Sequence, residues 1–110
     1  MNLDVVFNVS LEKKMNLIDE DLNILLEIRN KTNQNWLRNN QIKVEYKGNN
    51  SFFKDKIEVI QTEKTKFTLI PISNWNPVSK IILNLYCNNV LVQKSPLHLG
   101  MRKIKFFYVL

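Results

Sequence analysis

Apolar and polar residues alternate along most of this chain with a period of two, which is the period of a half-buried β-strand. The clearest stretch has Ile42, Val44 and Tyr46 at every second position. Lys43 and Glu45 fill the positions between them, so one side of the stretch is apolar and the other is charged. No segment of the sequence shows a convincing 3.6-residue period of an amphipathic helix. The pattern predicts a chain built from short strands.

The same alternation predicts further strands on both sides of this stretch. Their regularly spaced positions are Leu3, Val5, Phe7, Val9 and Leu11; Leu22, Ile24, Leu26 and Ile28; Phe53, Ile57 and Val59; Thr65, Phe67 and Leu69; and Ile81, Leu83, Leu85 and Cys87. Asn88-Asn89 predicts a two-residue hairpin turn, because asparagine tolerates a left-handed backbone, and the chain then returns over 90–93. We expect the last strand from about Arg102 onward, with Gly100 giving it a positive-φ or bulged entry.

Charged or turn-rich segments separate these strands, at 12–16, 29–36 and 72–77. Pro71 ends the strand before the last of these segments, because proline cannot donate a hydrogen bond to a central ladder. About seven or eight short strands at fairly even spacing are typical of a two-sheet sandwich. We therefore predict an all-β fold, an immunoglobulin-like antiparallel β-sandwich that occupies 1–110 as a single domain.

The chain of 110 residues carries a formal net charge of +6, which favours an anionic partner but does not bear on the fold. Its densest basic cluster is in the expected last strand, where Arg102, Lys103 and Lys105 are followed by Phe106 and Phe107. Basic residues interleaved with aromatic ones can bind nucleic acid. However, alternation sends Lys103 and Lys105 to one face and Phe106 to the other. This arrangement is typical of a strand with a lysine-lined solvent face, and it argues against nucleic-acid binding.

Residue types that carry catalysis or bind metal ions are scarce in this sequence. His98 is the only histidine, and its apolar alternating context near a turn favours a residue at a sheet edge over a catalytic one. Cys87 is the only cysteine and is expected to be a small core residue. The three acids of 19–21 would alternate between strand faces, so they cannot form an opposed acid–base pair. Two isolated glycines, Gly48 and Gly100, do not make a phosphate-binding loop. The sequence therefore predicts a protein that is not an enzyme and uses no cofactor or metal.

The first residues, MNLDVVFNVSLEKK, have no long apolar run and do not match the pattern of a signal peptide. No stretch approaches the roughly 20 apolar residues that a membrane-spanning helix needs, so we expect no membrane span. Together with the single cysteine, the lack of a signal peptide slightly favours the cytoplasm.

One pattern in the last third of the sequence is more specific than composition. Trp75-Asn76-Pro77 is followed by an apolar strand, a hairpin and Leu99-Gly100-Met101-Arg102-Lys103-Ile104. This order resembles the immunoglobulin-like domain of glycoside hydrolase family two, which includes β-galactosidases, β-glucuronidases and β-mannosidases. In that family the catalytic glutamates belong to a barrel that follows the sandwich. The resemblance implies a non-catalytic domain, with Trp75 at the domain boundary and Arg102 hydrogen-bonded within the domain or toward its neighbour.

Three roles remain open from the sequence. The chain is expected to be a structural spacer or interaction module beside a neighbouring domain, and a multidomain glycosidase is one such context. Alternatively, it is a standalone adaptor that binds a protein partner through an edge strand or a Trp-containing loop. As a third alternative, it binds carbohydrate by stacking an exposed indole on a sugar ring. The candidate interaction or domain-interface residues are Trp36, Trp75, Arg102, Lys103 and Lys105.

Overall fold

The computed structural model of this chain describes residues 5–30, 36–48, 52–72 and 78–102. Within these ranges the protein has an all-β, sandwich-like fold, as predicted. Its elements are β1 (Val5–Leu11), β2 (Met15–Leu17), β3 (Leu22–Asn30), α1 (Trp36–Asn39), β4 (Ile42–Tyr46), β5 (Lys56–Ile60), β6 (Lys64–Leu69), β7 (Lys80–Cys87), β8 (Val90–His98) and β9 (Gly100–Arg102). The predicted positions Leu3, 31–35, 73–77 and 103–110 lie outside the described residues.

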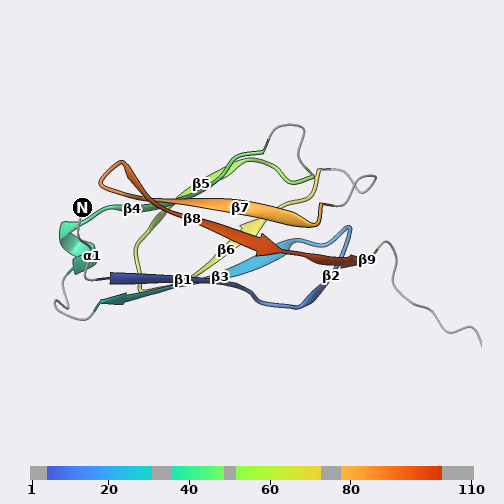
Figure 1. Ribbon diagram of the computed structural model, residues 1–110, viewed down its shortest axis with the longest axis horizontal. Coiled ribbons are helices and arrows are strands. Elements are labelled where there is room, and N and C mark those ends of the chain that lie inside the picture. Colours follow the sequence, from blue (N-terminus) through green and yellow to red (C-terminus); the bar gives the residue numbers. More distant parts are fainter. Residues whose placement is uncertain (1–4, 31–35, 49–51, 73–77, 103–110) are drawn as a thin grey trace, which may run out of the picture.

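Two sheets form the layers of the sandwich (Figure 1). One sheet has the strand order β1-β3-β6 and the other has the order β5-β4-β7-β8. Every pairing within these two sheets is antiparallel. β2 and β9 form a separate pair, which is parallel. Because β2 follows β1 and β9 follows β8, this pair joins an edge of one sheet to an edge of the other.

The inward side chains of the two sheets share one hydrophobic core. Along β4 and β7 the alternation is regular, and Val44, Leu83 and Leu85 are almost completely buried. Cys87 belongs to this core, as predicted, and burial raises the pKa of its thiol. The period of two in the sequence therefore separates a dry side from a wet side on each main sheet.

The hairpin between β7 and β8 turns at Asn88 and Asn89, as predicted, with left-handed φ angles of 50° and 66°. The backbone N–H of Gln41 donates to Oδ1 of Asn88 at 2.8 Å, which ties the turn to the start of β4. The returning strand is longer than the predicted 90–93 and continues to His98. Asparagine thus provides the turn geometry in a chain that has few glycines.

Two short elements overlap the ends of the segments 29–36 and 12–16, which the sequence predicted as loops. α1 is a single turn, too short to show a helical period, and Nδ2 of Asn40 donates to the carbonyl oxygen of Trp36 at 3.0 Å. β2 begins in the segment 12–16, expected to be a charged loop, and its three residues are too few to show alternation. β3 also extends to Asn30, beyond the expected start of the next loop.

Gly100 begins β9, but its backbone is not left-handed, so the predicted positive φ is wrong. What requires glycine is a close approach, because Gly100 lies opposite Met15 in the parallel β2–β9 pair. A Cβ atom at Gly100 would lie 2.9 Å from the carbonyl oxygen of Lys14, which is closer than such atoms pack. Only a residue without a side chain fits here without moving the backbone.

Candidate interaction surface

The candidate residues chosen from the sequence do not come together in one site. Trp36 in α1 and the backbone of Arg102 in β9 lie at opposite ends of the sandwich (Figure 1). The indole of Trp36 is half-buried against the core, with its ring centroid 6.4 Å from that of Phe7 in an edge-on arrangement. The remaining candidates, Trp75, Lys103 and Lys105, lie outside the described residues, as does the side chain of Arg102.

His98 lies exposed at the end of β8, an outer strand of its sheet, as expected for a histidine at a sheet edge. Its neighbour in register on β7 is Lys80. Among the described residues, no group of three or more histidine, cysteine or acidic side chains could hold a metal ion. No helix in the described part of the chain is long and apolar enough to cross a membrane.

The four-stranded sheet presents a broad outer surface, which we call the wide face. It consists of the outward side chains Lys43, Glu45, Ile57, Val59, Lys80, Ile82, Asn84, Tyr86, Leu91, Lys94, Pro96 and His98. Four of them, Ile57, Val59, Ile82 and Leu91, are aliphatic side chains that are 42% to 58% exposed. Aliphatic side chains on this outward side add little to the core and are available for contact with another molecule.

Cross-strand pairing arranges part of the wide face in rows along the β7–β8 hairpin. The rows are Lys80 with His98, Ile82 with Pro96, Asn84 with Lys94, and Tyr86 with Leu91. A bulge leaves Val92 unpaired and thereby brings Leu91 opposite Tyr86. Rows that carry a basic side chain therefore alternate with apolar rows, and successive rows are about 7 Å apart, since a strand advances about 3.3 Å per residue. Ile57 and Val59 form a second apolar patch on β5.

Among the described side chains of the wide face, Glu45 is the one acid, and it already accepts two hydrogen bonds. The hydroxyl of Tyr86 donates to its Oε1 at 3.2 Å, and Nδ2 of Asn84 donates to the same oxygen at 3.3 Å. Burial raises the pKa of the Tyr86 phenol, and the hydrogen bond to Glu45 raises it further by a smaller amount. Nζ of Lys43 donates to Oδ1 of Asn89 at 3.1 Å. No lysine of the wide face forms an ion pair with a described residue.

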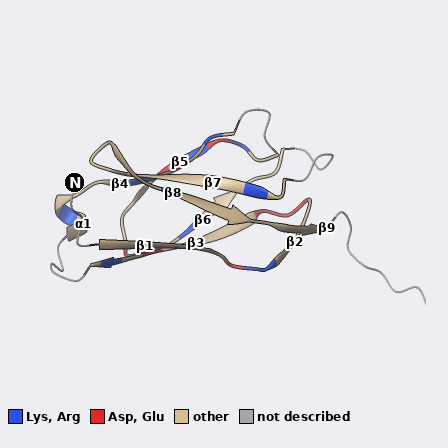
Figure 2. Cartoon of the chain, in the orientation of Figure 1, with Lys and Arg blue, Asp and Glu red and all other residues tan. Residues whose placement is uncertain are grey.

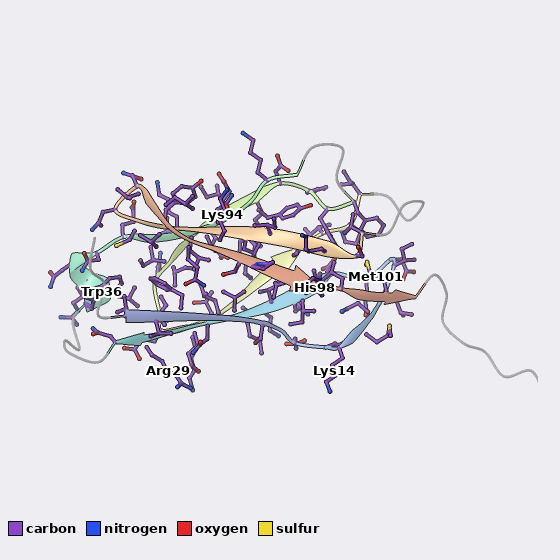
Figure 3. The ribbon with its side chains drawn as sticks, in the orientation of Figure 1. Lys14, Arg29, Trp36, Lys94, His98 and Met101 are labelled. Carbon is purple, nitrogen blue, oxygen red and sulfur yellow. The ribbon has the colours of Figure 1, made fainter. Side chains whose placement is uncertain are left out.

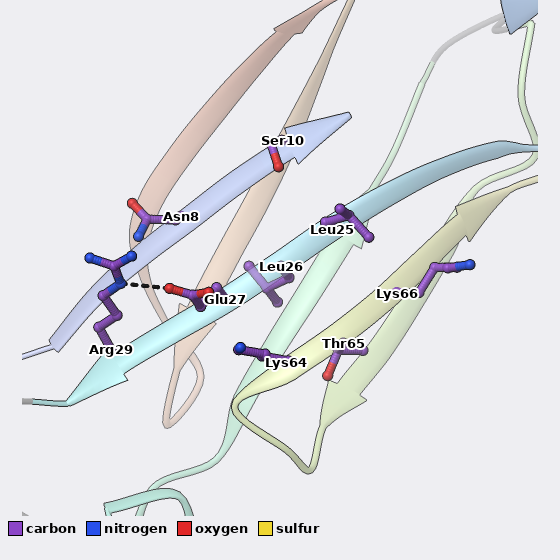
Figure 4. A pocket seen from close by; sticks show the side chains of 9 residues that line it. All are labelled: Asn8, Ser10, Leu25, Leu26, Glu27, Arg29, Lys64, Thr65 and Lys66. Atoms are coloured by element: carbon purple, nitrogen blue, oxygen red, sulfur yellow. Dashed lines mark hydrogen bonds and ion pairs between the residues drawn. The ribbon is translucent and has the colours of Figure 1, made fainter. Parts of the chain in front are cut away.

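The three-stranded sheet presents a smaller outer surface, which we call the narrow face. It consists of the outward side chains Val6, Asn8, Ser10, Asn23, Leu25, Glu27, Arg29, Lys64, Lys66 and Thr68. A hollow of about 440 Å³ lies over Leu25, with polar side chains from all three strands around it (Figure 4).

The charges around this hollow are largely paired within the domain. Nε of Arg29 donates to Oε1 of Glu27, and Nζ of Lys66 lies 2.9 Å from Oε2 of Glu12. The hydrogen bond from Arg29 lowers the pKa of Glu27, and the bond from Lys66 lowers the pKa of Glu12. Lys64 adds a favourable charge interaction with Glu27. Basic residues occur on both sheets (Figure 2), and Lys94 and Arg29 lie on opposite sides of the sandwich (Figure 3). Arg29 pairs with Glu27 (Figure 4), whereas Lys94 forms no ion pair with a described residue.

Three of the four outer strands of the two main sheets, β5, β6 and β8, carry features that hinder pairing with another chain. On β5, Glu58 points inward, and its buried Oε2 has no hydrogen-bond partner among the described residues. On β6, Lys64 and Lys66 project outward, and β8 contains Pro96, which has no N–H to donate. Inward charges, lysines and proline on outer strands all hinder the addition of a further strand. Contact through a sheet face is therefore favoured over contact through these edges.

The wide face was not predicted as a site from the sequence. One reason is that the sequence pattern did not show which alternate residues of β5 face the core. The alternation suggested Ile57 and Val59 as its apolar, inward positions, but the structure buries Ile60 and exposes these two. Ile60 pairs in register with Ile42, so the inward positions of β5 are shared by one isoleucine and two charged residues. The available signal was that apolar residues occur at both alternating positions of this segment, which leaves its phase ambiguous.

Comparison with known proteins does not assign the chain to a group: no protein-family model, no curated protein and no solved structure matches it. The resemblance to the sandwich domain of glycoside hydrolase family two stays a prediction.

Proposed function

We propose that this chain is a non-catalytic β-sandwich module that holds a neighbouring domain or a protein partner against its wide face. The observation that carries the proposal is the exposure of Ile57, Val59, Ile82 and Leu91 on the outward side of one sheet. Two apolar patches lie on either side of the charged residues of β4, one on β5 and one on the β7–β8 hairpin. Apolar patches rimmed by polar residues are typical of protein contact sites.

The arrangement of the chain supports a role between other domains. Val5 and Arg102, the first and last described residues, lie at opposite ends of the sandwich (Figure 1). A module of this shape holds two flanking domains apart by its whole length. This geometry suits a spacer, and it is compatible with the proposed context of a multidomain glycosidase.

The other roles that the sequence left open receive less support. Carbohydrate stacking needs an exposed aromatic face, whereas the ring of Trp36 packs against Phe7 and the core. An adaptor that adds a strand to its partner needs a free edge. Three of the four outer strands, β5, β6 and β8, are protected by an inward charge, by lysines and by a proline, which leaves β1 for such a contact. An adaptor that uses the wide face falls within the proposal.

The proposal is tested by placing the photo-crosslinking residue p-benzoylphenylalanine at Ile82 on the wide face or at Leu25 on the narrow face. The two positions are matched, since their side chains are 42% and 40% exposed. The full-length protein is irradiated in the cells that produce it, and adducts are mapped by mass spectrometry. We expect one defined partner, or one neighbouring domain, from Ile82 and also from Leu91, with far less from Leu25. Equal adducts from both faces, or none from Ile82, would overturn the proposal.

A further inference from the structure

We infer that the partner of the wide face is an extended protein segment in which acidic and aliphatic residues alternate at every second position. This inference rests on the proposed function and adds the chemistry of the partner. It is drawn from the order of the side chains along the β7–β8 hairpin and from the charge of its lysines, which form no ion pair with a described residue.

The rows of the hairpin set the spacing. Lys80 and His98 form a basic row, Ile82 and Pro96 an apolar row, and Lys94 then provides the next cation beside Asn84. An extended segment presents every second side chain on the same side, about 7 Å apart, which is the spacing of these rows. A segment that runs along the hairpin therefore meets a cation, an apolar row, a cation and an apolar row in turn. Acid, aliphatic, acid and aliphatic residues complement them.

The charges of the wide face favour an acidic partner. Lys80 and Lys94 are exposed, and neither forms an ion pair with a described residue. Glu45, the one acid among the described side chains of the face, forms no ion pair with either lysine, and its Oε1 accepts hydrogen bonds from Tyr86 and Asn84. On the narrow face, by contrast, Arg29 and Lys66 each have a carboxylate partner within the domain. Charge that is not compensated within a domain steers and orients a partner of opposite sign.

The same face is less suited to nucleic acid or to a lipid surface. Tyr86 is the one aromatic side chain among the described residues of the wide face, and its hydroxyl is bound to Glu45. The exposed apolar side chains of the face are aliphatic, and such side chains do not stack on bases. They also lie on a sheet face and not on a projecting loop, so they do not reach into a bilayer.

The inference is tested by titrating the ¹⁵N-labelled full chain with synthetic peptides and following backbone amide shifts. The probe is the peptide Glu-Ser-Leu-Ser-Glu-Ser-Leu, and the control is the same composition in the order Glu-Glu-Leu-Leu-Ser-Ser-Ser. We expect shifts on β7 and β8, binding that weakens with added salt, and at least about tenfold weaker binding of the control peptide. Equal affinity for the two peptides, or shifts confined to β1, β3 and β6, would refute the inference.

Charge-reversal variants provide the second measurement. K80E/K94E should weaken binding of the probe peptide by about tenfold or more, whereas K64E/K66E on the narrow face should leave it within about twofold. Unaltered binding by K80E/K94E counts against the inference. Tighter binding of a single-stranded oligonucleotide or of phosphatidylserine vesicles, shown by displacement of the peptide, also counts against the inference. If Ile82 still crosslinks to a defined partner while the peptide does not bind, the partner chemistry is wrong and the proposed function stands.

Discussion

The two outer faces of this sandwich come from one alternating pattern but use their side chains differently. On the narrow face, Arg29 and Lys66 are paired with carboxylates, and the apolar surface centres on a hollow over Leu25. On the wide face, aliphatic side chains are spread over three strands, and Lys80 and Lys94 have no carboxylate partner among the described residues. Among the described residues, the narrow face pairs more of its charges within the domain, whereas the wide face exposes aliphatic groups and lysines that form no ion pair. The difference shows that pairing, and not the mere number of basic residues, identifies the candidate surface.

The largest effect on stability is expected in the core beneath the wide face, at the residue that follows Ile82 on β7. Leu83→Ala removes a side chain that is 1% exposed and should lower the free energy of unfolding by about 2–5 kcal/mol. Ile82→Ala, one residue earlier on β7, should change it by no more than about 0.5 kcal/mol. Urea unfolding measures both. A large loss of stability for Ile82→Ala would mean that this side chain serves the fold and not a partner.

A smaller effect is expected at the pair of strands that connects the sheets of the two faces. Gly100→Ala places a Cβ atom against the carbonyl oxygen of Lys14, and it should lower the free energy of unfolding by about 1–3 kcal/mol. The side chain of Met15 also lies close, with its Sδ and Cε at 3.3 Å. Because the closer contact is with backbone, adding Met15→Ala should not restore stability. Full recovery in the double variant would show that the side chain of Met15 is what excludes alanine.

The smallest effect is a pH dependence of folding stability. Its sign is opposite for the paired glutamates Glu12 and Glu27 and for Tyr86 of the wide face. Glu12 and Glu27 have lowered pKa values in the folded chain, so their contribution to stability is present above the pKa of an unfolded glutamate and is lost as the pH falls. Tyr86 has a raised pKa, so the unfolded chain loses this proton first and stability is lost as the pH rises past about 10. Urea midpoints measured across pH should lose part of the acid dependence in Glu12→Gln and part of the alkaline dependence in Tyr86→Phe. Unchanged pH profiles in both variants would contradict this assignment.

Much of the fold could be predicted because the period of two separates inward from outward side chains wherever a strand is long enough. Val44 and Leu83 are buried for this reason, and the Asn88-Asn89 turn follows from the backbone preferences of asparagine. β2 could not be predicted, because it has three residues and buries a polar one, Asn16, which donates to the carbonyl oxygen of Lys13. A parallel pairing between such distant segments leaves no local pattern in either of them.

The candidate surface was less predictable than the fold. Alternation shows that Ile82 faces away from Leu83, but it does not show which outward residues are neighbours on adjacent strands. That depends on register, and at Leu91 it also depends on a bulge. On β5, Glu58 occupies an inward position, so the pattern wrongly placed Ile57 and Val59 on the core side. The required glycine at position 100 was expected, but the reason for it is a close approach between strands.

The parallel pairing of β2 with β9 has a mechanical consequence. Tension applied to Val5 and Arg102 would pull these two strands in opposite directions along their length, which loads the bonds between Met15–Leu17 and Gly100–Arg102 together in shear. A hairpin such as β7–β8, opened from its ends, instead breaks one bond at a time. We expect the chain to unfold at a higher force when pulled from its two ends than when pulled across the β7–β8 hairpin. Atomic force microscopy with both pulling directions measures this difference, and equal forces would contradict it. Tension applied along this axis would therefore be carried first by the β2–β9 pair.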